Sequence, residues 1–297
     1  MNIKDALKYI LSILIIYYII NQYGINISNI LSIVDIRYIV LIILISVIQH
    51  FLSAYRWMYI SKITNLNISF KNSIQFYYIS TFMNNILPGG IMGDMFRIYH
   101  TTENKIEILK MGKSVQAVIF ERLSGQIMLL AFFIVSLTFY FLVNHKYEAF
   151  FYLFFPSLLI FFVFKLFLNK RIKKMLSGKK ISNNLYAVFS GEVFWRHLVL
   201  SFFVVCSYVL IYMISAISLG LDIDYLAFMV FSPIILFSMT LPISIGGWGI
   251  RELTALLLSL LLGLSASASI SVSIIYGILN LICSLPGLYF FLKIRSK

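Results

Sequence analysis

Six ionisable residues lie inside or next to strongly apolar segments, where a charged group is costly unless it has a partner or a function. They are Asp94, Arg97, Glu121, Arg122, Arg251 and Glu252. A guanidinium group stays charged and offers a planar fork that fits a phosphate by two-point contact. Internal salt bridges, Asp94 with Arg97 and Glu252 with Arg251, are the alternative interpretation. Both interpretations can hold together.

Two of these arginines each end a run that contains proline and several glycines. The runs extend from Leu87 to Arg97 and from Leu241 to Arg251. The other candidate site residues in them are Gly89, Gly90, Gly93, Gly246, Gly247, Trp248 and Gly249. Glycine lets backbone N–H groups approach an anion, and a helix that restarts after the run adds a positive dipole end. We therefore predict two half-sites, one per run, that bind a phosphate in turn.

The two runs also match each other in one register. The matched pairs are Leu87 with Leu241, Pro88 with Pro242, Ile91 with Ile245, Gly93 with Gly247, and Arg97 with Arg251. A chance alignment is the alternative, because matches of Leu and Ile are common in so apolar a chain. The Pro, Gly and Arg matches favour an internal repeat within a single integral membrane domain, residues 1–297. Its halves are expected at roughly residues 38–143 and 198–292.

The charges that flank the two halves predict opposite orientations. Arg56 and Lys62 follow the apolar segment before the first run, whereas Asp222 and Asp224 follow the segment before the second. Basic residues collect on the cytoplasmic side, so the first segment should end inside and the second outside. Proline and glycine break helices at membrane depth, where bare backbone is tolerated only under protein or in a water-filled cavity. The runs are therefore interpreted as broken or re-entrant hairpins of an inverted repeat, an architecture of many transporters.

The composition defines the class of protein around these motifs. Of 297 residues, 61% are hydrophobic and 12% are charged, against about half apolar and about a quarter charged in ordinary soluble domains. This excludes a cytosolic enzyme, an extracellular module and a disordered chain. It predicts an all-α polytopic membrane protein with about eight membrane segments. The net charge of +13 is interpreted as basic loops beside anionic lipid, not as a nucleic-acid-binding surface.

Apolar runs and their flanks predict the individual segments. Full spans are expected at about residues 6–22, 38–60, 124–143, 149–168, 198–219 and 268–292, with shorter segments at 73–87, 227–241 and 252–264. An amphipathic helix is expected across residues 100–122, and a basic cytoplasmic loop across 169–197. Both termini are expected in the cytoplasm, with the turns near His145 and Asp222 outside, in a multi-pass protein of the cell membrane.

Two pairs of residues, Arg56-Trp57 and Trp195-Arg196, are interpreted as an interfacial belt with arginines that reach the lipid heads. Trp248 lies inside the second Gly-rich run instead, and we expect it to line the site. The belt interpretation assigns the first two pairs to anchoring in the membrane rather than to function.

No constellation of residues supports catalysis, a metal site or a cofactor. There is no Gly-Lys-Ser/Thr phosphate loop, the four histidines lack metal spacing, and Cys206 and Cys283 lie in apolar runs. The Asp222-x-Asp224 pair has the form of a glycosyltransferase metal motif, but an exposed acidic turn is favoured because no nucleotide-binding domain surrounds it. We therefore expect a protein that is not an enzyme and does not hydrolyse ATP.

The motifs resemble a known family. The run Asn85-x-Leu87-Pro88-Gly89-Gly90-x-x-Gly93-Asp94-x-x-Arg97 is similar to the signature of the lysylphosphatidylglycerol synthase transmembrane-region family. The same family is matched by Arg56-Trp57, Glu121-Arg122, and Leu241-Pro242 leading to Gly246-Gly247-x-Gly249-x-Arg251-Glu252. The resemblance covers about residues 5–293. It implies a flippase-like membrane region of the stand-alone kind, without the soluble synthase domain of the large members.

Three functions are compatible with these observations. The first is a lipid translocase that moves the head group of an anionic phospholipid, or of a polyprenyl-phosphate-linked lipid, while the acyl chains stay in the bilayer. Its movement would be downhill or ion-coupled, with protons carried by Asp94, Glu121 and Glu252. The second is a membrane partner that presents a lipid-linked substrate to a separate lipid-head synthase or glycosyltransferase. The third is a small-solute secondary transporter. The oligomeric state stays open.

Overall fold

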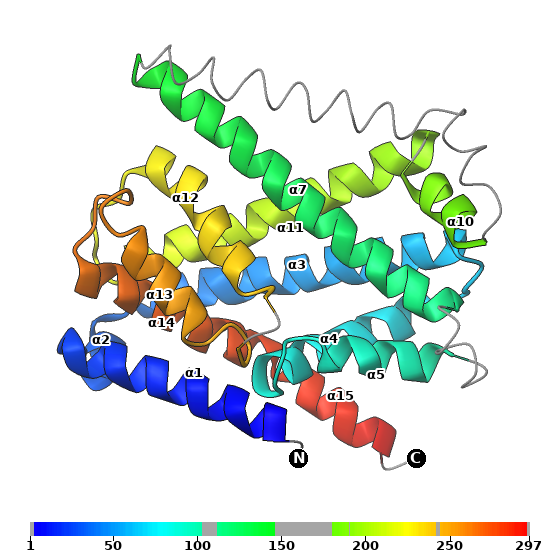
Figure 1. Ribbon diagram of the computed structural model, residues 1–297, viewed down its shortest axis with the longest axis horizontal. Helices are drawn as coiled ribbons and strands as arrows, with labels where there is room; N and C mark the ends of the chain where they lie inside the picture. Colours follow the sequence, from blue (N-terminus) through cyan, green and yellow to red (C-terminus); the bar gives the residue numbers. More distant parts are fainter. Residues whose placement is uncertain (1–2, 103–111, 146–179, 190, 242–243, 296–297) are drawn as a thin grey trace.

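The computed structural model describes residues 3–102, 112–145, 180–189, 191–241 and 244–295. These residues form α-helices joined by turns, and none of them lies in a β-strand (Figure 1). In chain order the helices are α1 (Ile3–Gln22), α2 (Ile27–Ile33), α3 (Ile36–Ile63), α4 (Phe70–Ile86), α5 (Met92–Thr101), α7 (Lys113–Val143), α10 (Lys180–Val188), α11 (Gly191–Ile217), α12 (Tyr225–Ser238), α13 (Ile250–Leu257), α14 (Ala266–Ser284) and α15 (Pro286–Arg295).

Four stretches of helix among the described residues are long and apolar enough to cross a bilayer. They are α3, α7, α11 and the joined α14–α15, and shorter apolar helices occur at Ser12–Gln22 and in α12. Large apolar side chains on the outer faces are exposed, such as Leu44 at 58% and Val135 at 69%, as expected of surfaces that contact lipid. The prediction of an all-α multi-pass membrane protein is confirmed. The expected span at residues 149–168 lies outside the described residues, so the total number of segments stays a prediction.

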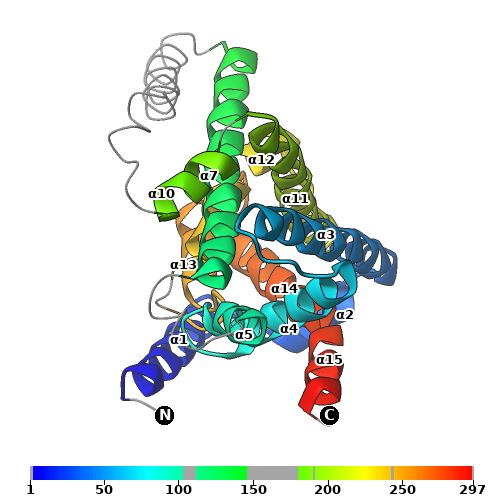
Figure 2. The same cartoon turned by 90° about the vertical axis from the view of Figure 1, so that its right-hand side faces the viewer.

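The helices α3 and α11 run antiparallel through the middle of the fold (Figures 1 and 2). Asp35, just before α3, donates its backbone N–H to the carbonyl oxygen of Ser218, just after α11, at 3.2 Å. Near the other end, Arg56 Nη1 donates to Ser201 Oγ at 3.1 Å. The start of α3 thus lies beside the end of α11, and the later part of α3 lies beside the early part of α11. The carboxyl ends of the two helices are therefore at opposite ends of the fold.

Each of these helices is followed by a helical hairpin that turns at a Pro- or Gly-containing run. The first hairpin is α4 with α5, and the second is α12 with α13. Since α3 and α11 are antiparallel, the hairpins start from opposite ends of the fold, and their tips meet near its middle (Figure 1). Pro88 and Ile245 form an antiparallel bridge between the tips. The two broken hairpins that the sequence predicts are therefore present and face each other.

The helices around the two runs have the same order. In the first half α3, α4, α5 and α7 follow one another, and in the second half α11, α12, α13 and α14 do. The first helix of each hairpin packs on the last long helix of the other half. Helix α12 packs on α7, and α4 packs on α14. The main apolar core lies around Tyr212, Phe228 and Ile275, where α11, α12 and α14 pack together. This order and packing are what an inverted repeat requires, while the common origin of the halves stays a prediction.

Polar side chains begin several helices, and a proline bends one of them. Asp35, Ser69, Asp224 and Ser265 cap α3, α4, α12 and α14, because each accepts hydrogen bonds from backbone N–H groups of the first turn. Pro233 lies inside α12, where its ring removes one helical hydrogen bond. The caps explain why the helices start after short polar turns.

Two predicted segments are wrong in their extent. The amphipathic helix expected across residues 100–122 is divided between α5 and α7, because the backbone of Thr102 is extended. The loop expected across residues 169–197 contains α10 and the first turns of α11, because apolar side chains of this part pack against α3 and α7. The span predicted at 268–292 is confirmed as the joined α14–α15, and within it Pro286, which has no backbone N–H, marks the boundary between the two helices.

Candidate functional site

The tips of the two hairpins touch through their backbones. Gly89 donates its N–H to the carbonyl oxygen of Ser244 at 3.1 Å. Gly246 has a φ of +55°, and a Cβ atom there would lie 2.5 Å from the backbone oxygen of Asn85. Glycine alone combines this backbone conformation with so close an approach. The second glycine run therefore brings the two halves of the molecule into direct contact.

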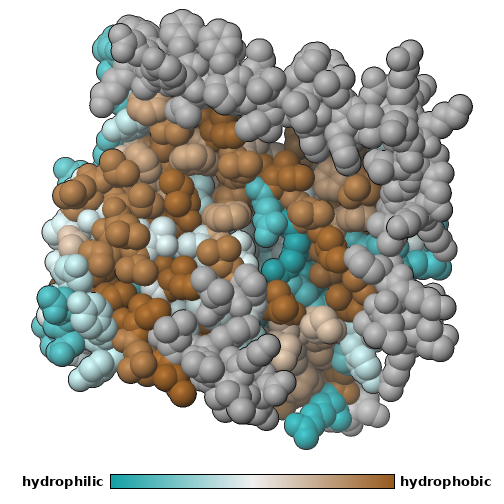
Figure 3. Space-filling view, viewed as in Figure 1, coloured by the Kyte–Doolittle hydropathy of each residue, from teal (hydrophilic) through white to brown (hydrophobic). Residues whose placement is uncertain are grey.

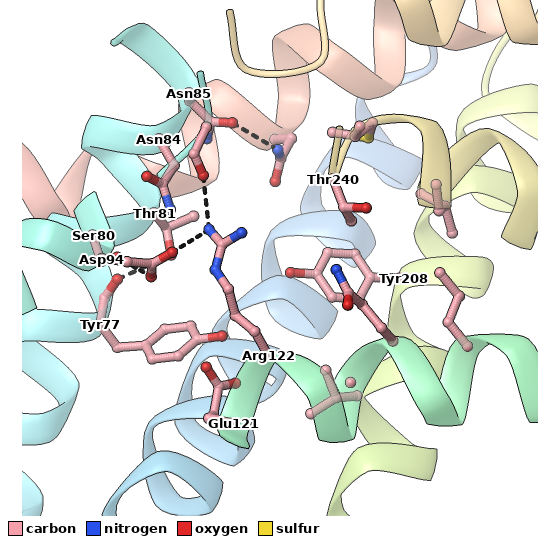
Figure 4. A pocket seen from close by; sticks show the side chains of 18 of the residues that line it. Tyr77, Ser80, Thr81, Asn84, Asn85, Asp94, Glu121, Arg122, Tyr208 and Thr240 are labelled. Carbon is pink, nitrogen blue, oxygen red and sulfur yellow. Dashed lines mark hydrogen bonds and ion pairs between the residues drawn. The ribbon is translucent and has the colours of Figure 1, made fainter. Parts of the chain in front are cut away.

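A cavity of about 250 Å³ lies beside the meeting point of the tips. Both halves contribute to its wall, through α3, α4, α5, α7, α11, α14 and the residues at and after the end of α12. The polar residues that line it are Arg56, Tyr77, Ser80, Thr81, Asn84, Asn85, Asp94, Arg97, Glu121, Arg122, Gln126, Tyr208, Thr240, Tyr276 and Asn280 (Figure 4). So many polar groups inside an apolar bundle are costly unless they face one another or a ligand.

Three arginines and two carboxylates of this wall form one ion-pair network. Arg56 pairs with Glu121, and Arg97 pairs with Asp94 and, at 3.4 Å, with Glu121. Arg122 also pairs with Asp94. Three guanidinium groups against two carboxylates leave a formal excess of one positive charge. Away from water this excess attracts an anion more strongly than it would at an aqueous surface.

Arg122 is the member of the network that reaches furthest into the cavity. Its side chain is 31% exposed, whereas those of Arg56 and Arg97 are 5% and 3% exposed. Its Nη2 donates to the backbone oxygen of Gly90 at 2.7 Å. In Figure 4 the side chain extends from α7 across the cavity toward Asp94. Arg122 is therefore placed to exchange part of these contacts for contacts with an anionic ligand.

The two buried arginines are held in fixed positions behind Arg122. The guanidinium of Arg97 lies over the rings of Trp57 and Tyr77, 4.9 Å from each ring centroid, which is within the range of a cation–π contact. Arg56 is held by Glu121 and by its hydrogen bond to α11. These arginines contribute positive charge to the cavity wall without leaving it.

A second ion pair, Arg251 with Glu252, is sealed in the protein. The two side chains are 1% and 0% exposed. Glu252 Oε1 accepts from Arg251 Nε at 2.9 Å and Nη2 at 2.5 Å, and from Ser273 Oγ at 3.1 Å. Its Oε2 accepts from the Gly249 N–H at 2.6 Å, and the Trp248 ring centroid lies 4.7 Å from the guanidinium carbon. This pair is formally neutral, and its carboxylate is surrounded by donors.

The structure divides the predicted site residues into two groups. Those on the cavity wall are Gly90, Asp94, Arg97, Glu121, Arg122 and Gly246. Those outside the lining of this cavity are Gly89, Gly93, Gly247, Trp248, Gly249, Arg251 and Glu252. Both salt bridges of the alternative interpretation are present, and Asp94 and Arg97 also line the cavity. Of the arginines of the two predicted half-sites, Arg97 lines this cavity and Arg251 does not.

Several of the predicted glycines serve packing. Gly93 donates its N–H to Asn84 Oδ1 at 2.8 Å, and a Cβ atom there would lie 2.0 Å from the backbone oxygen of Ser80. The N–H groups of Gly89 and Gly249 are also hydrogen-bonded within the protein. Gly93 therefore allows α5 to pack closely on α4, and these three N–H groups are occupied.

Comparison with known families settles the membership that the motifs suggested. The family model described as lysylphosphatidylglycerol synthase TM region matches residues 6–287. The chain belongs to this family. Comparison with curated proteins and with solved structures found no match. Membership supports a role connected with membrane lipid.

In this member of the family, the interpretation of Arg56-Trp57 as an interfacial belt is wrong. Trp57 is fully buried, and Arg56 belongs to the ion-pair network, because α4, α7 and α11 cover this face of α3. The sequence does contain a pattern that indicates a buried face of this helix. Gln49, Ser53 and Arg56 recur at helical spacing in an apolar segment, and all three are buried. Trp195, from the other pair, is 64% exposed.

The amide side chains of the cavity in this family member were also missed at the level of the sequence. Asn84 and Asn85 end α4, Gln126 lies on α7, and Asn280 lies on α14. Asn280 Nδ2 donates to Asn85 Oδ1 at 3.2 Å and so links the two halves. Their position within apolar segments could have indicated a shared polar site, because a buried amide, like a buried charge, needs a hydrogen-bond partner.

Proposed function

We propose that the protein is a lipid translocase that moves the anionic head group of a phospholipid across the cell membrane while the acyl chains stay in the bilayer. The observation that carries the proposal is the excess positive charge of a cavity at which two oppositely directed broken hairpins meet. A charged head group that leaves water needs such a path of fixed polar groups, because hydrocarbon does not solvate it. The family's connection with a phospholipid-modifying synthase supports a lipid as the substrate.

In this proposal Arg122 makes the direct contact with the phosphate. Its planar guanidinium offers two parallel N–H groups to two phosphate oxygens, and its partial exposure lets the phosphate compete with Asp94 for it. The amides of Asn84, Asn85 and Gln126 surround the same space and supply donors and acceptors for the uncharged part of the head. Arg56 and Arg97 balance Glu121 and Asp94, so that the site as a whole stays cationic.

The proposal gives the second arginine a structural role. Arg251 is enclosed by Glu252, Ser273 and two aromatic rings, so an incoming phosphate would first have to displace a neutral, saturated pair. We assign this pair to holding α13 against α14. The phosphate site is thus built mainly by the first half, and the relay expected between Arg97 and Arg251 is not part of the proposal.

The proposal includes the setting of the protein. The translocase is not itself an enzyme, it moves lipid down a gradient, and its substrate comes from a separate lipid-head synthase or glycosyltransferase in the same membrane. Both termini lie in the cytoplasm, which the basic ends of the chain favour.

Periodate oxidation of phosphatidylglycerol tests the proposal without a label on the lipid. Periodate cleaves the vicinal diol of this head group but does not cross the bilayer, so it oxidises only the outer leaflet of a sealed vesicle. The purified protein is reconstituted into phosphatidylcholine vesicles that contain phosphatidylglycerol, and the released formaldehyde is followed over time. We expect the inner-leaflet fraction to be oxidised when the protein is present and to stay protected in protein-free vesicles.

Vesicle integrity is followed in the same samples by retention of an entrapped dye. If the inner-leaflet phosphatidylglycerol stays protected in intact vesicles that contain folded protein, the translocase proposal is wrong.

A further inference from the structure

A second cavity, almost wholly apolar, lies between α7 and α12. Its volume is about 360 Å³, and its wall includes Ile127, Leu130 and Phe133 of α7 and Pro233 and Phe237 of α12. Ile127, Leu130 and Phe237 are 37%, 53% and 44% exposed, so this apolar groove opens on the outer face of the helices. Pro233 removes a backbone hydrogen bond from α12 where the helix borders the groove.

The groove adjoins the cationic cavity. Gln126 and Leu129 line both of them. In Figure 3 a small hydrophilic patch lies in the middle of a largely hydrophobic face, in the region between α7 and the hairpin tips of Figure 1. A polar site thus lies next to an apolar groove on the outer face of the helices. The two compartments match the two parts of a phospholipid.

We propose that the groove between α7 and α12 binds an acyl chain of the same anionic phospholipid whose phosphate lies at Arg122. The lipid then enters sideways, with its head passing Gln126 and its chain remaining between the two helices. This inference rests on the proposed translocase function and adds the entry site to it. It also states the substrate class, a lipid with a long alkyl chain whose phosphate-containing head carries a net negative charge, rather than a soluble phosphate ester.

The test is photolabelling with two probes that have the same diazirine-bearing acyl chain. One probe is phosphatidylglycerol and the other is phosphatidylcholine, each present at trace level in nanodiscs of unlabelled phosphatidylcholine with the purified protein. Labelled peptides are located by mass spectrometry. We expect residues 123–133 and 233–237 to be labelled about tenfold more by the phosphatidylglycerol probe, because only its head carries a net charge that complements the cavity.

Variants connect the groove with the cavity. Arg122→Gln should reduce labelling of the groove by the phosphatidylglycerol probe to the level of the phosphatidylcholine probe, although the substituted residue is in the other cavity. Ile127→Trp should fill the groove and lower the labelling by both probes. Val135→Trp is the matched control, because Val135 is 69% exposed on the same helix and lines neither cavity.

Equal labelling of the groove by the two probes in the wild-type protein would overturn the inference, since the groove would then hold only bulk lipid. The comparison of probes needs no variant, so a failure of Ile127→Trp to fold does not affect it. The periodate assay separates the two levels of the argument. Transport of phosphatidylglycerol with equal labelling would remove the entry site and leave the translocase, whereas absence of transport would remove the translocase itself.

Discussion

The two buried ion clusters of this protein each include the arginine that ends a glycine run, yet they differ in exposure and in charge. In the first, Arg122 is 31% exposed at a cavity, and three arginines face two carboxylates. In the second, Arg251 and Glu252 are 1% and 0% exposed and balance each other. The first cluster has charge and space left for a ligand, and the second has neither.

The difference shows how one motif can serve two purposes in an inverted repeat. A neutral, enclosed pair makes folding depend on its integrity, because removal of one partner leaves an uncompensated charge away from water. A network with one surplus cation and an open side leaves binding energy for a ligand. We therefore expect substitutions in the second cluster to affect mainly the amount of folded protein, and substitutions of the exposed arginine in the first to affect mainly transport.

The largest expected effect on stability is that of Glu252→Gln. This change leaves Arg251 charged and buried without a counter-charge, at a cost of about 3–5 kcal/mol. The measurement is the thermal unfolding midpoint and the monodisperse fraction in detergent. Glu192→Gln is the matched control, since the Glu192 side chain is 90% exposed. If Glu252→Gln unfolds at the wild-type temperature, the pair is not the structural clamp that we describe.

A smaller effect on stability is expected from replacing glycine by alanine at two positions that each face an arginine. A Cβ atom on Gly277 would lie 2.1 Å from Arg251 Nη2, whereas one on Gly125 would lie 3.5 Å from Arg56 Nη1. Arg251 is enclosed and cannot withdraw, so Gly277→Ala should cost about 1–3 kcal/mol. Gly125→Ala should be neutral or stabilise by up to about 1 kcal/mol, because alanine favours a helix over glycine. Equal unfolding midpoints for the two variants would contradict the claim that Arg251 is more tightly enclosed than Arg56.

The smallest effect concerns the ring beneath Arg97. Trp57 is fully buried, and its Nε1 has no hydrogen-bond partner among the described residues. Trp57→Phe keeps an aromatic face under the guanidinium and should cost about 1 kcal/mol. The same change at Trp195, which is 64% exposed, should shift the unfolding midpoint little. Equal shifts at both positions would restore the belt interpretation of Trp57.

Much of the fold could be predicted from the sequence because local chemistry determines it. Pro88 cannot continue a helix, the glycines nearby permit a sharp turn, and long apolar runs are stable only as helices in a membrane. The basic and acidic flanks of the runs before each hairpin predicted their opposite directions, and α3 and α11 are antiparallel. Pro286, in contrast, was overlooked as a helix end, because the apolar run continues unbroken past it.

The candidate site could be predicted only in part, because sequence position does not reveal which faces of distant helices meet. Arg97 and Arg251 occupy the same place in the two runs, but the first lies beside a cavity and the second is enclosed by α14. Arg56 looked like an interfacial residue until its partner Glu121, on another helix, was located. The amides that line the cavity come from three helices, and no single segment records that they face one space.

The central claim, that the cationic cavity binds the head group of an anionic lipid, is tested most directly by periodate accessibility of phosphatidylglycerol with Arg122→Gln. The control is Arg196→Gln, which removes an arginine whose side chain is 67% exposed. Loss of a charged two-point contact weakens binding of the head group by roughly 10- to 100-fold. We therefore predict that Arg122→Gln, reconstituted at equal amounts of folded protein, transports at least about tenfold more slowly than wild type, and that Arg196→Gln transports at the wild-type rate. Wild-type transport by folded Arg122→Gln would contradict the account.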